Sequence, residues 1–401
     1  MIMQSYSEFE DFVCPAANAV DLKFVSHEKD FDDNSTVFHP DYTHQVFGEN
    51  EVIFGYKKLQ VKLYYTPGHL NTFIGINYAG KIDPKKHEGL KADGILETLA
   101  ELVEGGFTTN QDEFLAKLPD EAKFHPYGEL LEAYRKDDVQ YEIYKIETVT
   151  PGFASYHSRL QVFLLWFVDA SSFLDIDDDK WNFYMLYEKH IENGQPFYSI
   201  VGYLTLYNYY AYPDKIRPRI SQALIFPPYQ RQHHGTKLLN AVYNDLIVQK
   251  DVYDITVEDP SDGFVALRDM LDCQNCQTLP KFQPPMIHQA FTNATATAAR
   301  EKFKINKKQC QRVYEILRLR ATDRNNTEQY KNYRLTVKNR LNAPFQKEKK
   351  DLEKLKHFVG SNELTDVSTK LSNEERMAKL QEAYKQLEQD YQAVIEKLAT
   401  L

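Results

Sequence analysis

Residues 221–248 read SQALIFPPYQRQHHGTKLLNAVYNDLIV, and our interpretation of the fold starts from this stretch. Its apolar run at residues 223–226 is predicted to be a strand. The two prolines that follow must end that strand, because proline cannot donate a hydrogen bond to a sheet. Beyond a polar loop, apolar residues recur at helical spacing over residues 238–247, so the loop leads into the first turn of an amphipathic helix.

The polar loop at residues 230–236 is a candidate phosphate-binding element. The start of a helix presents unpaired amide N–H groups and the positive end of the helix dipole, and both favour a phosphate. A strand, a loop and a helix in this order therefore predict a cradle for a pyrophosphate. An ordinary helix start gives the same local pattern, so the choice between them depends on the rest of the chain.

Length and composition limit the function classes. At 401 residues the chain is too long for one ordinary core, so we expect two or three domains. The 27 tyrosines and 24 phenylalanines suggest grooves that are lined by aromatic rings. A net charge of -10 argues against generic nucleic-acid binding, which depends on phosphate neutralisation by Lys and Arg, and favours a basic peptide as partner.

Cysteine usage and hydropathy predict a soluble intracellular protein. No apolar run is long enough to cross a bilayer, and the first residues lack the charged and apolar regions of a signal peptide. The four cysteines, Cys14, Cys273, Cys276 and Cys310, fit a reducing compartment. Cys273 and Cys276 form a CxxC motif without a second pair to complete a zinc site, so we expect structural thiols and no metal.

Residues 1–128 are predicted to form a first, mixed α/β domain. Alternating or apolar runs predict strands at residues 21–25, 59–65 and 72–78, and helical spacing predicts a helix at residues 95–103. The loop Glu49, Asn50 and Glu51 is acidic. Such carboxylates are either solvated or face a cationic peptide.

Residues 129–276 are predicted to form a second domain, with a mixed central sheet of the α/β class. Strands are expected at 139–146, 181–187, 197–206 and 252–257, with one helix at 153–170. Asn193-Gly194 lies between two of these strands and is the strongest hairpin signal in the chain. Residues 277–401 form a predicted helical domain, whose apolar seam from Leu380 to Leu398 we expect to pack on the body or on a partner helix.

Glu258 is the candidate general base. It follows a predicted strand, at the rim of the sheet where open α/β folds place ligands. A lysine with a pKa of about 10.4 is protonated at neutral pH, so any reaction in which its amine is the nucleophile requires a base. Like-charge repulsion from Asp259 would raise the pKa of Glu258 and make it a better base. Two acidic residues at a turn are the simpler reading.

Two further stretches combine polar and aromatic groups. Asp169 ends the predicted long helix, where the dipole disfavours a carboxylate, so it is either exposed or retained for function. The run Asp177–Asp179 is expected to be a solvated loop, because three adjacent side chains cannot converge on one ion. Residues 207–210 form an aromatic strand end that suits either core packing or an extended peptide.

Five longer segments carry a resemblance to one family. They are YTHQVFG at 42–48, FGYKKL at 54–59, LTLYNYYAYPDKIRPRISQALI at 204–225, VEDPS at 257–261 and FKINKKQCQRVYEILRLR at 303–320. With them the chain resembles the catalytic subunit of the type B histone acetyltransferase over about residues 38–340. The polar loop also resembles the coenzyme A loop of Gcn5-related acetyltransferases, in which Gln230 and Gly235 match. His233 stands where that pattern has a glycine, so its side chain must point away from the phosphates.

The resemblance implies both an architecture and an activity. It implies an N-terminal mixed domain, a central acetyltransferase domain and a helical C-terminal part. It also implies transfer of the acetyl group of acetyl-CoA to lysines in the tail of newly made, non-nucleosomal histone four before chromatin assembly. A WD-repeat histone chaperone is the implied partner, in the nucleus and the cytoplasm, without direct nucleic-acid or membrane binding.

The family's functional positions are carried over residue by residue. The implied catalytic residues are Glu258 as base, supported by Asp169 and Asp259. The implied acetyl-CoA contacts are Ala223, Leu224, Ile225, Gln230, Arg231, Gln232, His233, His234, Gly235, Thr236 and Ser261. The implied peptide contacts are Glu49, Asn50, Glu51, Tyr207, Asn208 and Tyr209.

The implied mechanism is direct attack of the lysine amine on the thioester carbon, without an acyl-cysteine intermediate. Two alternatives stay open. One is a histone-binding scaffold of the same fold that transfers no acetyl group. The other is an acetyltransferase for a different amine acceptor, such as a protein N-terminus or a polyamine.

Overall fold

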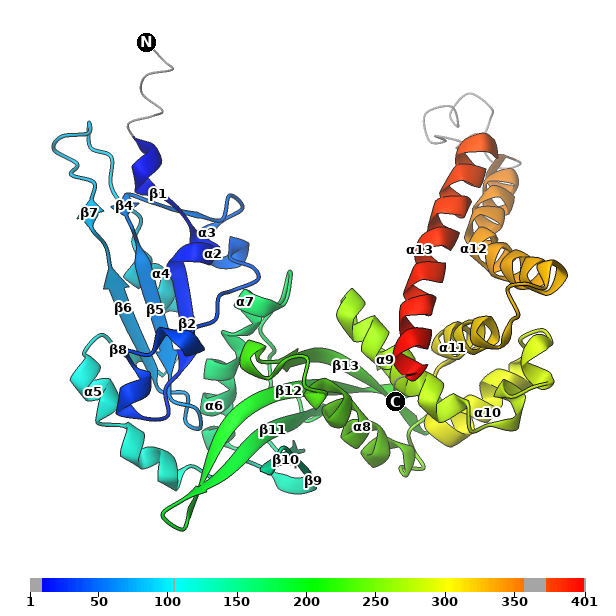
Figure 1. Ribbon diagram of the computed structural model, residues 1–401, viewed down its shortest axis with the longest axis horizontal. Coiled ribbons are helices and arrows are strands. Elements are labelled where there is room, and N and C mark those ends of the chain that lie inside the picture. The colour runs from blue at the N-terminus through cyan, green and yellow to red at the C-terminus, as the bar shows by residue number, and fades with distance from the viewer. Residues whose placement is uncertain (1–8, 104, 357–372, 400–401) are drawn as a thin grey trace. The chain divides into compact units, whose positions relative to one another are not determined.

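The computed structural model describes residues 9–103, 105–356 and 373–399 (Figure 1). The chain divides into two compact units. The first consists of Met1–Tyr209 and Arg219–Val242, and the second of Tyr210–Pro218 and Tyr243–Leu401. This division follows spatial contacts rather than chain order, so the three domains with boundaries after residues 128 and 276 stay a prediction.

A four-stranded sheet lies in the N-terminal part of the first unit. Its strands, in spatial order, are β2 (Val20–Phe24), β5 (Gln60–Tyr65), β6 (Thr72–Asn77) and β8 (Phe107–Thr108). β2 and β5 are parallel, β5 and β6 are antiparallel, and β6 and β8 are parallel. The first three strands lie where the sequence predicts them, within one residue at each end.

Short elements surround this sheet. Two small sheets pair β1 (Val13–Pro15) with β3 (Val52–Phe54) and β4 (Tyr56–Lys57) with β7 (Gly80–Lys81). The helices are α2 (Ala16–Ala19), α3 (His44–Phe47), α4 (Ile95–Leu102) and α5 (Gln111–Leu115), with 3-10 turns η1 (Glu10–Phe12), η2 (Glu28–Asp30), η3 (Asn34–Thr36) and η4 (Leu118–Lys123). Helix α4 confirms the predicted helix at residues 95–103.

The large sheet is built from consecutive strands. They are β9 (Glu129–Lys136), β10 (Val139–Ile146), β11 (Trp181–Glu192), β12 (Gln195–Ala211), β13 (Lys215–Ile225) and, at the edge next to β13, β14 (Thr256–Val257). Both residues of the Asn193-Gly194 turn have positive φ, 51° and 79°, as a type I′ hairpin requires. The predicted hairpin and strand β10 are confirmed. Asp137 and Asp138 also have positive φ and join β9 to β10 in the same way, but strand β9 was not predicted.

The single helix predicted at residues 153–170 is wrong. The chain forms α6 (Pro151–Gln161) and then α7 (Leu164–Phe167). Between them the amide of Phe163 donates to the carbonyl of Leu160, three residues back, so the helix tightens and breaks. The carbonyl of Trp166 accepts the amides of Asp41 and Tyr42 at 2.9 and 3.0 Å. These two amides take the place of the N–H that the next turn of the helix would have donated, so helix α7 ends here.

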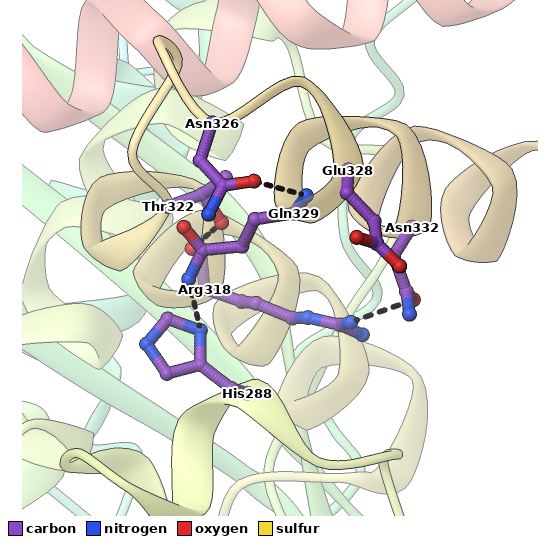
Figure 2. A pocket seen from close by; sticks show the side chains of 7 residues that line it. All are labelled: His288, Arg318, Thr322, Asn326, Glu328, Gln329 and Asn332. Atoms are coloured by element: carbon purple, nitrogen blue, oxygen red, sulfur yellow. Dashed lines mark hydrogen bonds between the residues drawn. The ribbon is translucent and has the colours of Figure 1, made fainter.

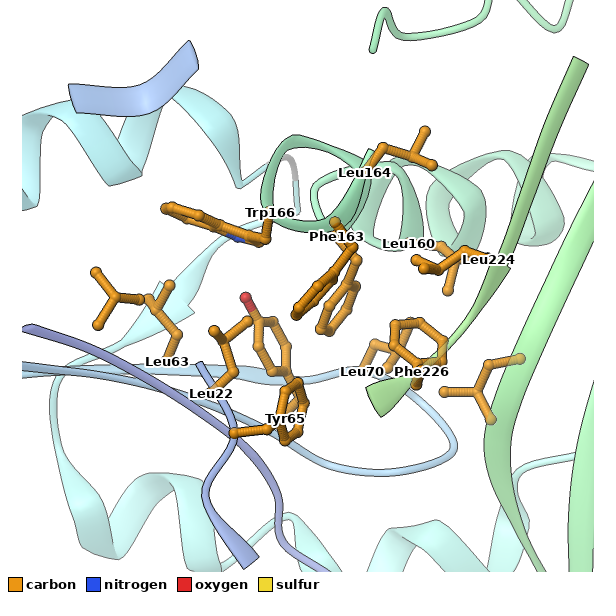
Figure 3. Close-up of a cluster of buried hydrophobic side chains, with 14 of the residues drawn as sticks. Leu22, Leu63, Tyr65, Leu70, Leu160, Phe163, Leu164, Trp166, Leu224 and Phe226 are labelled. Carbon is orange, nitrogen blue, oxygen red and sulfur yellow. The ribbon is translucent and has the colours of Figure 1, made fainter. Parts of the chain in front are cut away.

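One hydrophobic core joins these elements within the first unit (Figure 3). Figure 3 shows Leu22, Leu63 and Tyr65 facing the rings of Phe163 and Trp166. Leu224 of strand β13 and Phe226, the residue directly after the strand, enter the same core. The ring of Phe226 lies 4.8 Å from that of Phe163, centroid to centroid. This packing fixes the point at which β13 gives way to η5 (Pro227–Tyr229) and α8 (His234–Ile247).

The second unit is mainly helical. Its elements are β14 (Thr256–Val257), α9 (Asp262–Cys276), η6 (Pro280–Phe282), η7 (Met286–His288), α10 (Asn293–Phe303), α11 (Lys307–Ala321), α12 (Thr327–Lys356) and α13 (Asn373–Ala399). The strand predicted at 252–257 is largely wrong, since only β14 is regular. Val252 bridges Ile216, while the amide of Ile255 donates to Lys304 at 2.7 Å, so this segment changes partners along its length.

Helix α13 packs on the core of the second unit. Its residues Leu380, Tyr384, Tyr391, Val394 and Leu398 are buried, which confirms that the apolar seam packs on the body. A buried carboxylate, Glu315 of α11, receives both Arg340, at 2.6 and 2.7 Å, and the hydroxyl of Tyr391, at 2.9 Å. The three helices α11, α12 and α13 are therefore joined by one charged cluster.

Burial raises the pKa of the Cys273, Cys276 and Cys310 thiols, which lie in this core as free cysteines. Across the described parts of the chain, no helix combines the length and apolar character that a membrane span needs. The mixture of sheets and helices confirms the predicted α/β class.

Candidate active site

The end of strand β13 presents the first group of predicted cofactor residues. Leu224 is buried in the core of the first unit, while Ala223 and Ile225, on the opposite face of the strand, are half-buried. The side-chain amide of Gln230 donates to the carbonyl of Ile225 at 2.9 Å. The strand end and the loop that follows are therefore tied together directly.

The loop from Gln230 to Thr236 adopts backbone conformations that normally favour glycine. Arg231 has a φ of 59° and His233 a φ of 67°, and both side chains are exposed. The carbonyl of His233 accepts the amide of Lys237 at 3.1 Å and so opens helix α8. The backbone at His233 thus takes the conformation of the missing glycine, and its imidazole lies at the surface.

Neighbouring side chains hold this loop from one side. Lys136 of strand β9 donates to the side-chain oxygen of Gln232 at 3.1 Å, and Gln232 donates to the carbonyl of Pro228 at 2.9 Å. The hydroxyl of Tyr134, also in β9, lies 2.7 Å from Nδ1 of His234. Neither Tyr134 nor Lys136 was predicted. The turn-favouring pair Asp137-Asp138, directly before the strand predicted at residues 139–146, was the signal that could have located them.

The charges of the loop suit a diphosphate. Residues 230–237, QRQHHGTK, contain no carboxylate and include two cations, and the loop opens a helix of 14 residues. Burial lowers the pKa of His234 to about 4, with a smaller contribution from the positive charge of Lys136. This imidazole is therefore neutral at physiological pH. The donor groups therefore fit the phosphates of a coenzyme A thioester.

The predicted base and its neighbours lie in the second unit. Glu258 and Asp259 follow β14 directly, and both are exposed. Ser261 is the N-cap of α9, where its Oγ accepts the amide of Phe264 at 3.3 Å. Asp254, four residues before Glu258, is buried and paired with Arg217 at 2.6 Å. An ion pair between a buried carboxylate and a partly exposed arginine thus anchors the short segment that carries the candidate base.

Glu51 and Asp169 contact two residues that are adjacent in the chain, Thr43 and His44 respectively. The carboxylate of Glu51 accepts the hydroxyl and the amide of Thr43 at 2.6 and 3.0 Å, and these hydrogen bonds lower its pKa. Asp169 lies two residues beyond α7, with its carboxylate 3.5 Å from Nε2 of His44. The other two residues of the predicted acidic loop, Glu49 and Asn50, are exposed.

The predicted aromatic contacts also form a cluster. The hydroxyl of Tyr207 donates to Asp178 at 2.7 Å, and this hydrogen bond lowers the pKa of Asp178. The ring of Tyr207 lies 4.6 Å from that of Tyr209, over which Arg219 stacks at 4.6 Å. Asn208, between them, has a buried side-chain oxygen without a hydrogen-bond partner among the described residues. Sequence reasoning missed Asp178, because the acidic run around it was interpreted as a solvated loop.

A separate polar pocket of about 300 Å³ lies in the second unit (Figure 2). Its lining consists of His288, Arg318, Thr322, Asn326, Glu328, Gln329 and Asn332. Figure 2 shows that Gln329 and Asn332, from the start of α12, contact His288 and Arg318 within it. None of the predicted site residues lines this pocket, and the described residues contain no cluster of three or more potential metal ligands.

Comparison with known proteins identifies the family. Residues 12–169 match the family described as histone acetyl transferase HAT1 N-terminus. Residues 268–319 match the family described as histone acetyltransferase type B catalytic subunit, C-terminal. Among solved structures, an aminoglycoside acetyltransferase from an uncultured soil metagenomic sample is 19% identical, covers 38% of this chain and 95% of its own, and has a TM-score of 0.24.

Whole-chain relatives extend this match. The histone acetyltransferase type B catalytic subunit of Rattus norvegicus is 41% identical over 395 residues, which cover 97% of this chain and 94% of the relative. The protein of the same description from Homo sapiens is 40% identical with the same coverage. One from Cryptococcus neoformans is 34% identical over 77% of this chain and 82% of its own. The chain therefore belongs to the family of histone acetyltransferase type B catalytic subunits.

Proposed function

We propose that this protein transfers the acetyl group of acetyl-CoA to lysine side chains in the N-terminal tail of newly synthesised, non-nucleosomal histone four. Membership of an acyltransferase family supports the reaction class. The structural observation that carries the proposal is the loop Gln230–Thr236, where His233 keeps a left-handed backbone and leaves its side chain exposed. A loop of this conformation leaves the amides at the start of α8 for a phosphate.

Acetyl-CoA supplies the activated acetyl group in this proposal. The loop Gln230–Thr236 would hold its diphosphate through its amides, except that of Gln230, which donates to the carbonyl of Pro227 at 3.2 Å. The backbone of Ala223, Leu224 and Ile225 would pair with the pantetheine arm. Lys136 and Arg231 add positive charge next to the loop. Ser261 is less suited to a cofactor contact, because its hydroxyl already caps helix α9.

Glu258 acts as the general base in the proposed mechanism. It removes the proton from the target lysine, whose amine then attacks the thioester carbon. As the C–N bond forms, the C–S bond breaks, and the departing coenzyme A thiolate takes up the proton that the acetylated nitrogen releases. Asp259 next to it and Asp169 near His44 are the proposed supporting carboxylates. The ion pair between Arg217 and Asp254 supports this role, since a base must be held within hydrogen-bond reach of its proton.

A basic, extended peptide is the proposed acceptor. The residues proposed to bind it are Glu49, Asn50, Glu51, Tyr207, Asn208 and Tyr209, to which Asp178 is added by its contact with Tyr207. An exposed carboxylate at Glu49 and the aromatic rings would receive cationic side chains and the apolar parts of the tail. The net charge of -10 favours the same partner.

The proposal also includes a WD-repeat histone chaperone as the partner, chromatin assembly as the setting, and a location in the nucleus and the cytoplasm. The alternatives are a scaffold without transfer activity and an acetyltransferase for another amine.

Mass spectrometry separates these alternatives. The full chain is incubated with acetyl-CoA and, in parallel, with a histone four tail peptide, the same peptide with its lysines blocked, and a polyamine. Acetylation of lysine in the first peptide alone is expected. Transfer only to the N-terminal amine or to the polyamine would refute the histone proposal, and no transfer despite coenzyme binding would favour the scaffold.

A further inference from the structure

The hairpin of β9 and β10 contacts the first residue of helix α8. Tyr134 and Tyr141 are directly paired across this hairpin, and their rings stack at 5.2 Å with an interplanar angle of 15°. The ring of His234 lies 4.5 Å from that of Tyr141. An aromatic platform on one hairpin therefore supports the residue that begins the helix of the phosphate loop.

Among the residues that the structure describes, a single hydrogen bond fixes the imidazole of His234. The residue is 1% exposed, and its Nδ1 lies 2.7 Å from the hydroxyl of Tyr134. Its other nitrogen, Nε2, is buried and has no hydrogen-bond partner in the described part of the chain. Without the Tyr134 hydroxyl, both ring nitrogens would be buried and unpaired, which favours a displaced ring.

The position of His234 controls the geometry of its neighbours in the loop. His233, with its left-handed φ of 67°, precedes it, and Gly235 follows it in the first turn of α8. A shift of the buried ring would turn these peptide units, and with them the amides that face outward at the helix start. An anion site of backbone amides depends on their fixed directions.

We infer that Tyr134 is a positioning residue for the diphosphate of acetyl-CoA, acting through its hydrogen bond to His234. The inference rests on the proposed function, because it takes this loop to be the coenzyme site. Tyr134 need not touch the coenzyme. Lys136, two residues further along β9, fixes Gln232 of the same loop, so the hairpin holds the loop at two points.

Tyr134→Phe tests the inference, because it removes one hydroxyl and keeps the ring. Isothermal titration of the full chain with acetyl-CoA is expected to give a dissociation constant about three- to tenfold higher, the effect of one lost hydrogen bond. The KM for acetyl-CoA should rise by the same factor. At saturating coenzyme, kcat and the KM for the histone peptide should stay within about twofold of the unmodified chain.

Tyr141→Phe is the matched control. It removes a hydroxyl at the paired position on the next strand, one that makes no described hydrogen bond to His234, and keeps the stacked ring. Its coenzyme affinity should be unchanged. Equal weakening by both substitutions would point to general loosening of the hairpin and would overturn the inference, as would a Tyr134→Phe variant of unchanged affinity.

His234→Asn and His234→Leu provide a second pair if Tyr134→Phe does not fold. The asparagine side chain can place a polar atom near the position of Nδ1, whereas leucine cannot. Asparagine should therefore retain more coenzyme affinity than leucine, because it can keep a hydrogen bond to the Tyr134 hydroxyl, and equal losses in the two variants would overturn the inference. If the unmodified chain bound no acetyl-CoA, the proposed function would be refuted. If it bound acetyl-CoA normally and Tyr134→Phe had no effect, only the inference about Tyr134 would be refuted.

Discussion

The guanidinium of Arg217 binds the carboxylate of Asp254 through two hydrogen bonds, Nε to Oδ1 at 2.6 Å and Nη2 to Oδ2 at 3.3 Å. Arg217 lies near the start of β13, and Asp254 lies in the irregular segment that precedes β14. Backbone hydrogen bonds from Tyr253 to Ile216 at 2.8 Å and from Ile255 to Lys304 at 2.7 Å also hold this segment, so the ion pair is one of several contacts that order it. Glu258 follows four residues later in the chain.

Asp254→Asn is expected to loosen that segment. Asparagine keeps the shape but loses the charge, and it leaves a partly exposed arginine without its counterion. We expect the free energy of unfolding to fall by about 1–3 kcal/mol in urea titrations. We also expect a several-fold lower kcat with little change in acetyl-CoA affinity. The exposed Asp251 offers the matched control Asp251→Asn, and equal losses in both variants would contradict the prediction.

Glu258→Gln is expected to lower kcat by roughly 10²-fold or more, because an amide cannot accept the proton of the lysine. Acetyl-CoA affinity, measured by titration calorimetry, should change little. Glu301→Gln, an exposed position on α10, controls for the loss of one carboxylate. Turnover that matches this control across the pH range would exclude Glu258 as the base.

The stability and acetyl-CoA affinity of variants at His233 are expected to depend on how readily the new residue adopts the left-handed backbone conformation. Its left-handed φ costs an L-residue about 1–2 kcal/mol, and glycine removes this cost while losing about 0.5–1 kcal/mol of chain entropy. His233→Gly should therefore match or slightly exceed the unmodified protein in thermal stability and acetyl-CoA affinity. His233→Val, with a branched side chain at the same φ, should lose both. Weaker coenzyme binding in the glycine variant would show that the imidazole itself contacts the coenzyme.

Acidification is expected to destabilise the protein through His157. This histidine is fully buried among Phe153, Phe183 and Tyr203, with neither ring nitrogen hydrogen-bonded to any described residue. Burial lowers its pKa from 6.5 to about 4. The unfolded chain therefore binds a proton between these pH values and the folded chain does not, so stability is complete above pH 6.5 and falls by about 3 kcal/mol toward pH 4.

Urea unfolding at pH 7.5, 6, 5 and 4 measures this dependence. His157→Leu should flatten it, although not completely, because His234 titrates in the same direction. His125→Leu, at an exposed position, should leave it unchanged. An equally steep loss of stability in His157→Leu would assign the effect to other groups.

The elements that depend only on residues close together in the chain could be predicted from the sequence. The Asn193-Gly194 hairpin follows from the turn itself, because both residues accept positive φ at little cost. Strand β10 follows from the alternation of apolar and polar residues over its first five positions, VQYEI. Strand β9, in contrast, reads ELLEAYRK, which is rich in helix formers, and becomes a strand because it pairs with β10.

The predictions that were wrong concern elements whose limits are set by contacts between residues far apart in the sequence. Helix α7 stops at residue 167 because the carbonyl of Trp166 is taken by the amides of Asp41 and Tyr42, which no local pattern reveals. The position of the phosphate loop was predictable from its strand, turn and helix. Its support by Tyr134 was not, since that hydroxyl belongs to a residue 100 positions earlier in the chain.

The charged cluster of Glu315, Arg340 and Tyr391 has a consequence for biosynthesis. Tyr391 belongs to α13, the last of the described helices to leave the ribosome. Until it emerges, a nascent chain carries Glu315 without the hydroxyl of Tyr391, and α11 without the apolar side chains of α13 that share its core. The helical unit therefore completes its folding only late in translation, after every residue of the first unit has already been synthesised.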